Sequence, residues 1–349
     1  AAGIADAGDR AAAAATRAVV AAEGVCARLD REPLALVRAG TVAVRDLGRL
    51  ARDLDLADEE LALLVDLLVE AGVLAVGGPF GQRSLGLRPE ADAWLSASRS
   101  RRWADLVAAW RTADLALEDH LVAPPRPSSR QSAADRARPL AGRRLAAASA
   151  RRRGLLQALG TPTRVDALAA VLAWRQPMVW PSPQGAGGGE LEATVRAVLE
   201  GAAFLGVAVL DLGRAEAGLA AVELVAGVAA AGLAEVAGPA LPDGSDRFLV
   251  AGDLTVVAPG GLAPAVQTRL AGRETAGSGT WRIDEGSLRR AFDEGRSADE
   301  VLDFLRSHSS TPLPQALQYL VADAARRHGR LRVGGAATYL RGDPALVAG

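Results

Sequence analysis

The stretch Arg247–Arg341, which begins RFLVAGDLTVVAPGGLAP and ends YLVADAARRHGRLRVGGAATYLR, decides the fold that we predict for the end of this chain. It opens with two β-type runs, Phe248–Val250 and Leu254–Val257. The Pro-Gly-Gly that follows stops the second run, because Pro lacks an amide donor and Gly weakens an extended segment. A third run, Thr280–Ile283, leads into helical sequence. We therefore expect strands first and helices after them.

Capping and spacing signals predict three helices in the rest of this stretch. Ser287 is predicted to cap the first, and Ser297–Glu300 has the sequence of a capping box, in which Ser and Glu each satisfy a free backbone donor. The third helix carries Leu317 and Val321 at helical spacing. Its end at Arg326–Gly329 places cations at the negative helix terminus and Gly at the left-handed stop. Two short strands are expected to close the stretch: Leu331–Val333 and Ala336–Leu340.

Three segments of this stretch carry a family resemblance: GDLTVVAPG (252–260), SLRRAFDEGRSADEVLDFL (287–305) and TPLPQALQYLVADAARRHGRLRVG (311–334). They resemble the helicase-associated domain of a large actinobacterial family, which is similar to the N-terminal, damage-recognition-like part of XPB-type DNA helicases. RAGTVAVRDLGRLARDLDL (38–56) and AWRQP (173–177) also look like that family. The resemblance implies an accessory domain that touches DNA, and it does not imply a motor or a catalytic site.

The residue composition excludes several functions. All 40 basic residues are arginine, because the sequence contains no lysine. A GC-rich genome explains this bias, and the alternative is that arginine serves phosphate contacts. Without lysine there is no Walker A loop and no lysine Schiff base. We therefore expect a non-enzymatic chain without a cofactor, and not an ATP-driven helicase.

Charge, cysteine and histidine content narrow the partners and the compartment. A net charge of −1 gives no overall basic field, so DNA binding requires a local arginine patch. The lone Cys26 fits a reducing cytosol, and three scattered histidines have no zinc-ligand spacing, so we expect no metal. Neither a secretory signal nor a membrane span is expected, since Leu219–Val236 is mostly Ala and Gly and contains two glutamates. A cytoplasmic protein, with nucleoid association as an option, is predicted; the start at Ala1 instead of Met would suit a piece of a longer chain.

The first domain, predicted at 1–122, has the pattern of a winged helix. A leading helix over Ala1–Asp30 is followed by helices Val44–Leu54 and Glu59–Ala71, and then by a hairpin of Val73–Val76 and Ser84–Leu87. One further helix, Ala91–His120, is expected to carry three tryptophans at helical spacing: Trp94, Trp103 and Trp110.

Acidic side chains on the expected recognition helix argue against DNA reading by this domain, because they repel phosphate. The positions that we expect to be exposed there are Asp58, Glu59, Glu60, Asp66 and Glu70. A structural or protein-binding role is favoured, with DNA recognition as the alternative. The tryptophans are interpreted as core, with base stacking as the alternative.

The remaining domain boundaries follow from a Pro- and Ser-rich linker at 123–138. A second winged-helix-like domain is expected at 139–245, with helices over Val165–Trp174, Leu191–Gly201 and Ala215–Ala237. The XPB-N-terminal-like α/β domain is placed at 246–349. The predicted fold class is thus α+β, mostly helical, with tandem winged-helix-like units followed by a small α/β domain.

Arginines of the last domain are the candidate nucleic-acid ligands, because guanidinium groups fork onto phosphate oxygens and several together release several counterions. They are Arg289, Arg290, Arg296, Arg326, Arg327, Arg330 and Arg332. A secondary basic strip is formed by Arg143, Arg144, Arg151, Arg152 and Arg153. The alternative for both sets is helix capping and surface solvation.

No catalytic constellation emerges from the sequence. Asp253 and the pair Asp284-Glu285 are acidic positions that a nuclease metal site would use, but nothing completes such a site. Ser287 and Ser309, with His308, lack the Gly-framed elbow of a nucleophile. We expect surface and structural roles for these residues.

Three functions remain open. The first is a non-enzymatic helicase-associated module that binds DNA in repair or a related transaction. The second is a scaffold that docks a helicase or another repair protein and has little DNA affinity of its own. The third, which the acidic helices disfavour, is a transcriptional regulator.

Overall fold

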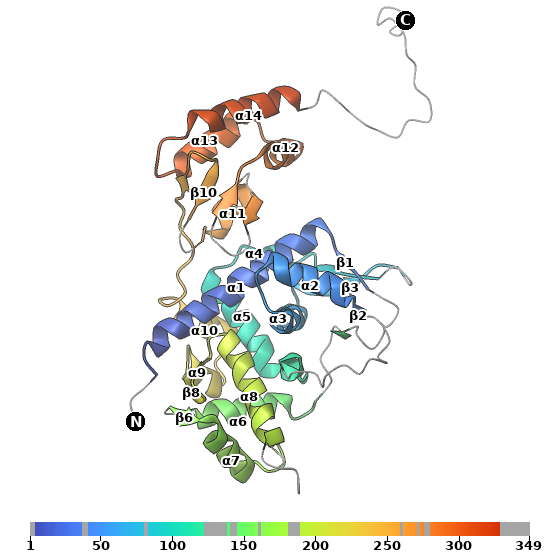
Figure 1. Ribbon diagram of the computed structural model, residues 1–349, viewed down its shortest axis with the longest axis vertical. Helices are drawn as coiled ribbons and strands as arrows, with labels where there is room; N and C mark the ends of the chain where they lie inside the picture. Colours follow the sequence, from blue (N-terminus) through green and yellow to red (C-terminus); the bar gives the residue numbers. More distant parts are fainter. Residues whose placement is uncertain are drawn as a thin grey trace, which may run out of the picture. The chain divides into compact units, whose positions relative to one another are not determined.

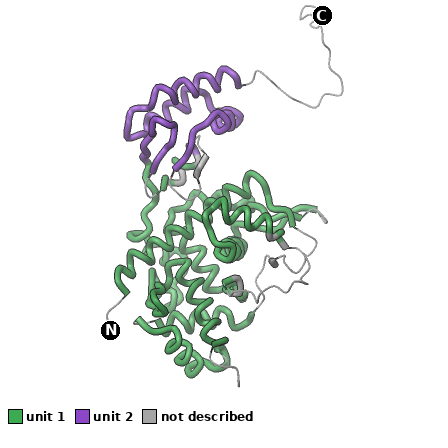
Figure 2. Tube along the Cα trace, viewed as in Figure 1, with its two compact units in different colours: residues 1–246, 260–268, 275–279 green, residues 247–259, 269–274, 280–349 purple. Residues whose placement is uncertain are grey.

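The computed structural model describes residues 4–36, 41–79, 83–121, 138–139, 145–159, 162–180, 189–258, 261–270, 273–275 and 280–328 (Figure 1). The chain divides into two compact units (Figure 2). Unit 1 comprises residues 1–246, 260–268 and 275–279, and unit 2 comprises residues 247–259, 269–274 and 280–349. The described residues are mostly helical with small antiparallel sheets, which confirms the coarse α+β prediction.

The first half of unit 1 joins three helices to a three-stranded sheet. Its elements are α1 (Ala7–Arg31), β1 (Leu34–Ala35), β2 (Thr41–Val42), α2 (Val44–Asp53), α3 (Asp58–Glu70), β3 (Leu74–Gly77) and β4 (Ser84–Leu87). The sheet order is β1-β4-β3, and both pairings are antiparallel. β2 pairs instead with β5 (Arg138–Pro139), so the end of the predicted linker contributes a strand.

Helix α3 is the centre of this half and not a surface helix. Every side chain from Leu61 to Leu68 is buried, because α1, α2 and α5 (Arg99–Thr112) all pack against α3. Asp66, which we predicted to be exposed, is only 2% exposed. The acidic side chains of α3 that solvent reaches thus stand only at its two ends. Because the middle of the helix is buried, little of its surface remains to enter a DNA groove.

The predicted helix Ala91–His120 is wrong as a single element, since the chain forms α4 (Ala91–Leu95), α5 and a 3-10 turn η1 (Leu117–His120). Ser98 causes the first break, because its side chain accepts a hydrogen bond from the Arg101 amide (3.2 Å) and caps α5.

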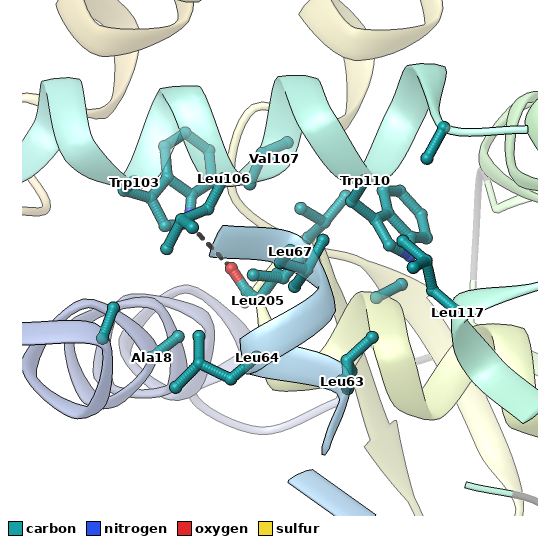
Figure 3. Packing of buried hydrophobic residues seen from close by; sticks show 14 of the residues in the cluster. Ala18, Leu63, Leu64, Leu67, Trp103, Leu106, Val107, Trp110, Leu117 and Leu205 are labelled. Carbon is teal, nitrogen blue, oxygen red and sulfur yellow. Dashed lines mark hydrogen bonds between the residues drawn. The ribbon is translucent and has the colours of Figure 1, made fainter. Parts of the chain in front are cut away.

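The tryptophans of α4 and α5 lie in the core, as the structural interpretation predicted. Trp103 and Trp110 are completely buried, and Trp94 nearly so. Figure 3 shows Trp103 beside Leu64 and Ala18, with its indole Nε1 donating to the Leu205 carbonyl (2.8 Å). Buried in this way, they present no ring face to a base.

The second half of unit 1 repeats the order of helices and strands. Its elements are α6 (Ala148–Ala158), β6 (Thr163–Arg164), α7 (Val165–Arg175), α8 (Gly189–Phe204), β7 (Ala208–Asp211), β8 (Arg214–Ala217), α9 (Ala221–Val225) and α10 (Ala230–Ala237). The sheet order is β6-β8-β7. One buried cluster runs through both halves, because α10 packs on α5 and α8 packs on α1.

The long helix predicted over Ala215–Ala237 is wrong, because glycines divide this segment. Gly218 lies so close to the Gly206 carbonyl that a Cβ there would collide with it. Gly227 has φ +80°, a left-handed conformation that Gly adopts readily. The segment therefore forms β8, α9 and α10.

Unit 2 places a small sheet before three helices. Its elements are β9 (Leu249–Val250), β10 (Thr255–Val257), α11 (Pro264–Arg269, which begins in unit 1), β11 (Arg273–Thr275), β12 (Thr280–Arg282), α12 (Glu285–Asp293), α13 (Ala298–His308) and α14 (Gln315–Arg327). The sheet order is β11-β12-β10-β9, with Val256 opposite both Trp281 and Val250. α12 and α13 both pack on α14.

The helix caps of unit 2 test the local predictions. Ser297 and Glu300 form the expected capping box. Ser287 is not the cap of α12 but its third residue; Asp284 is the cap and accepts from the Ser287 amide (2.7 Å). The strands predicted over Leu331–Val333 and Ala336–Leu340 lie outside the described residues.

Candidate functional site

Two neighbouring arginines stand on the outer face of α12. The inner face of this helix buries Leu288 and Phe292, which pack toward α14. Arg289 and Arg290 follow directly and are both exposed, since the helical turn directs them away from the buried face. Whether they are available to a ligand depends on the carboxylates around them.

Side chains at the end of α14 hold the carboxylates one turn from Arg289. Glu285 and Asp293 stand four residues before and after Arg289, at the spacing of a helical ion pair. Instead, Glu285 lies 3.4 Å from Arg327 and Asp293 lies 2.8 Å from His328. The end of α14 thus takes both potential partners of Arg289.

The carboxylate one turn from Arg290 is also held elsewhere. Glu294 lies 2.6 Å from Arg296, which also donates to the Arg269 carbonyl (2.5 Å). Within the described residues, the side chain of neither Arg289 nor Arg290 makes an ion pair or a hydrogen bond. The two guanidinium groups therefore keep all of their donors for a ligand.

The arginines at the end of α14 are paired with carboxylates. Arg326 lies 2.5 Å from Asp323, and Arg327 lies 2.7 Å from the same carboxylate in addition to its contact with Glu285. Two cations and two anions leave this cluster without net charge. Exposed pairs of this kind stabilise by only about 0.2–1 kcal/mol. Their carboxylates nevertheless remain beside any phosphate that approaches.

The described residues divide the predicted arginine ligands into paired and unpaired ones. Arg296, Arg326 and Arg327 are each paired with a carboxylate, whereas Arg289 and Arg290 are not. The remaining two predicted ligands, Arg330 and Arg332, lie outside the described residues. What the structure brings together is a pair of free guanidinium groups on α12.

The secondary basic strip does not form over the described residues. The prediction that Arg152 lies at the surface is wrong, because its side chain is completely buried. Arg151 donates to the Val179 carbonyl (3.0 Å), and Arg153 is exposed. Arg143 and Arg144 lie outside the described residues.

Arg152 instead forms a buried ion pair that joins α6 to η1. Its Nε and Nη2 donate to both carboxylate oxygens of Glu118 (2.7 and 2.9 Å). Further donors reach the carbonyls of Ala113 (2.7 Å) and Leu115 (2.6 Å), and its guanidinium lies 5.6 Å from the Trp110 ring. These contacts satisfy the charge in the core, so its role is structural.

The acidic and nucleophilic residues considered for catalysis make local structural contacts. Asp253 accepts from the amide and hydroxyl of Thr255 (3.1 and 3.0 Å), which hold the pKa of this carboxyl below its usual value. The Ser287 hydroxyl donates to the Asp284 carbonyl, and the Ser309 hydroxyl donates to the Thr311 carbonyl. Among the described residues no group of three or more His, Cys, Asp or Glu side chains is placed to hold a metal ion.

One surface feature escaped sequence reasoning. Trp174 and Met178 are 82% and 92% exposed at the end of α7. The spacing of Val171 and Trp174 from the buried Val165, Leu168, Ala169 and Leu172 puts both on the outward side of α7, and this spacing was the signal that could have revealed them.

None of the helices in the described residues combines the length and the apolar character that crossing a bilayer requires.

Comparison with protein families finds one match, in the part of the chain that carries α12. Residues 248–349 match the family described as helicase conserved C-terminal domain. This confirms the coarse prediction of a helicase-associated domain in the last third; the narrower likeness to XPB-type helicases and the actinobacterial origin stay predictions. Comparison with curated proteins gave no match.

Proposed function

We propose that this chain is a non-enzymatic, helicase-associated module that binds DNA through Arg289 and Arg290 of α12. The observation that carries this proposal is the pairing pattern: Arg327, His328 and Arg296 hold Glu285, Asp293 and Glu294, so the two guanidinium groups stay free. Each can fork onto phosphate oxygens and release condensed counterions. Repair, XPB-like damage recognition and a place at the nucleoid belong to the same proposal. The family match to residues 248–349 supports its helicase-associated part.

Unit 1 acts in this proposal as a scaffold of two winged-helix-like halves. Apart from β2 in the first half, each half runs helix, strand, helix, helix and hairpin, and in each sheet the first strand pairs with the third, which pairs with the second. This order supports the winged-helix interpretation. Neither third helix suits a DNA groove, since α3 is buried along its middle and α8 opens with Glu190 and Glu192.

The test is fluorescence anisotropy with duplex, forked and single-stranded DNA at low salt. We expect binding that Arg289→Gln with Arg290→Gln weakens. The control is Asp303→Asn with Arg306→Gln, which removes an exposed ion pair of α13 without changing net charge and should leave affinity unchanged. Equal losses in both variants would place the binding elsewhere.

A protein-docking scaffold is the second candidate. The neutralised cluster of Glu285, Asp323, Arg326 and Arg327 favours it, because this corner offers little net attraction to DNA. No DNA binding at low salt would remove the first candidate and leave this one. The partner would then be a helicase or another repair protein.

A further inference from the structure

The outward side of α7 is apolar, which is unusual for a helix at a protein surface. Val171, Trp174 and Met178 form what we call the α7 ridge, and they are 39%, 82% and 92% exposed. The exposed Ala167 and Ala170 lie on the same side. The other side of the helix is already buried in the core of unit 1.

The helical part of the α7 ridge extends over about two turns. Residues 167, 170, 171 and 174 follow the spacing of a stripe that packs against a second helix. At 1.5 Å per residue, these positions span roughly 11 Å of α7, and Met178 lies beyond the last helical residue, Arg175. A stripe of this length matches an amphipathic helix of about two to three turns.

The chain beyond α7 is anchored, so the exposure of Met178 is built into the fold. The Gln176 side chain occupies the space over Gly154 of α6. Arg151 donates to the Val179 carbonyl (3.0 Å) and lies 5.6 Å from the ring of Trp180, which is completely buried. Met178 is thus held outward between fixed neighbours.

The charges beside the α7 ridge decide which occupant fits. Arg175 is exposed, and within the described residues it makes no ion pair. The acid on the same helix, Asp166, is held by two hydrogen bonds from Arg164 (3.0 and 2.8 Å). A second copy of this face offers Arg175 no free carboxylate, whereas an acidic partner does.

We infer that the α7 ridge is a docking site for an amphipathic helix of another protein, with an apolar stripe and Asp or Glu on its flank. Trp174 is the anchor, because a large rigid side chain at the middle of an apolar patch dominates binding. Met178 adapts to the partner through its flexible thioether. This inference concerns unit 1 alone and does not rest on the DNA binding proposed for α12.

The experiment selects binders of the whole chain from a displayed library of random peptides of about 15 residues. We expect the enriched peptides to have apolar residues at i, i+3 or i+4, and i+7, with acids alongside. Trp174→Ala should weaken them by at least about 30-fold, the loss typical of a hot spot of about 2 kcal/mol. Arg175→Glu should weaken acidic peptides but not variants with Lys in place of their acids.

Val222→Ser is the matched control, since Val222 is a 75% exposed apolar residue on α9, and it should leave peptide binding unchanged. Thermal melting by circular dichroism checks that every variant stays folded. Failure to enrich any amphipathic peptide, or equal binding by Trp174→Ala, overturns the proposal. So does a dimer in sedimentation that Trp174→Ala dissolves, or single-stranded DNA binding that the same change abolishes.

Discussion

Replacing Arg152 with Met is expected to destabilise unit 1 strongly. The guanidinium makes four hydrogen bonds, two to Glu118 and one each to the carbonyls of Ala113 and Leu115. Met fills a similar volume but donates nothing. The Glu118 carboxylate would stay buried with one remaining donor, the Trp110 indole (2.8 Å).

The magnitude follows from the stranded charge. Removing one partner of a buried ion pair costs about 3–5 kcal/mol. Each orphaned carbonyl adds to this in principle, but local relaxation recovers part of the loss, so we expect about 4 kcal/mol for Arg152→Met. The double variant Arg152→Met with Glu118→Leu removes the stranded charge as well and should regain most of this loss.

Urea unfolding, followed by tryptophan fluorescence and circular dichroism, measures these differences. Arg153→Met is the matched control, because Arg153 is exposed and its loss should change stability by less than about 0.5 kcal/mol. A cost below about 1 kcal/mol for Arg152→Met would refute the reasoning. So would a double variant as unstable as the single one.

Three further predictions concern Cys26, the masking carboxylates and the α13 cap. Burial raises the pKa of the Cys26 thiol to about 12, so iodoacetamide at about pH 8 should label the chain only after denaturation, as mass spectrometry would show. Glu285→Gln with Asp323→Asn frees the arginines at the end of α14 and should tighten DNA binding in anisotropy; unchanged affinity would mean that these carboxylates mask nothing. Ser297→Ala should cost about 1 kcal/mol in urea unfolding. Hydrogen bonds from the Ser297 amide and, second, from its hydroxyl lower the pKa of the Glu300 carboxyl below its usual 4.5. The stabilisation by this cap is therefore present at pH values above 4.5 and is lost as the pH falls through the lowered pKa.

Features encoded within one or two turns could be predicted from the sequence. The Ser297–Glu300 box forms as expected, since both partners stand three residues apart. The cap of α12 was misplaced because Asp284 and Ser287 are both good capping residues, and the earlier one ends the strand-to-helix turn. The break at Ser98 was hidden by apolar spacing that continues across it.

Features that depend on distant partners could not be predicted. Asp66 and Arg152 look like surface residues, and only packing of neighbouring helices buries them. Glu285 and Arg327 are 42 positions apart, and their contact decides which arginines of unit 2 stay free. Local sequence shows the number of charges but not their pairing.

The salt dependence of DNA binding tests the central claim, that the unpaired arginines of α12 contact phosphate. Each phosphate contact contributes about 0.9 to the slope of log K against log salt, so Arg289→Gln with Arg290→Gln should reduce that slope by about 1.8. The control, Arg17→Gln with Arg175→Gln, removes the same charge from two other exposed arginines and should leave the slope unchanged. Equal slopes for the original chain and the α12 variant, measured between about 50 and about 200 mM salt, would contradict the claim.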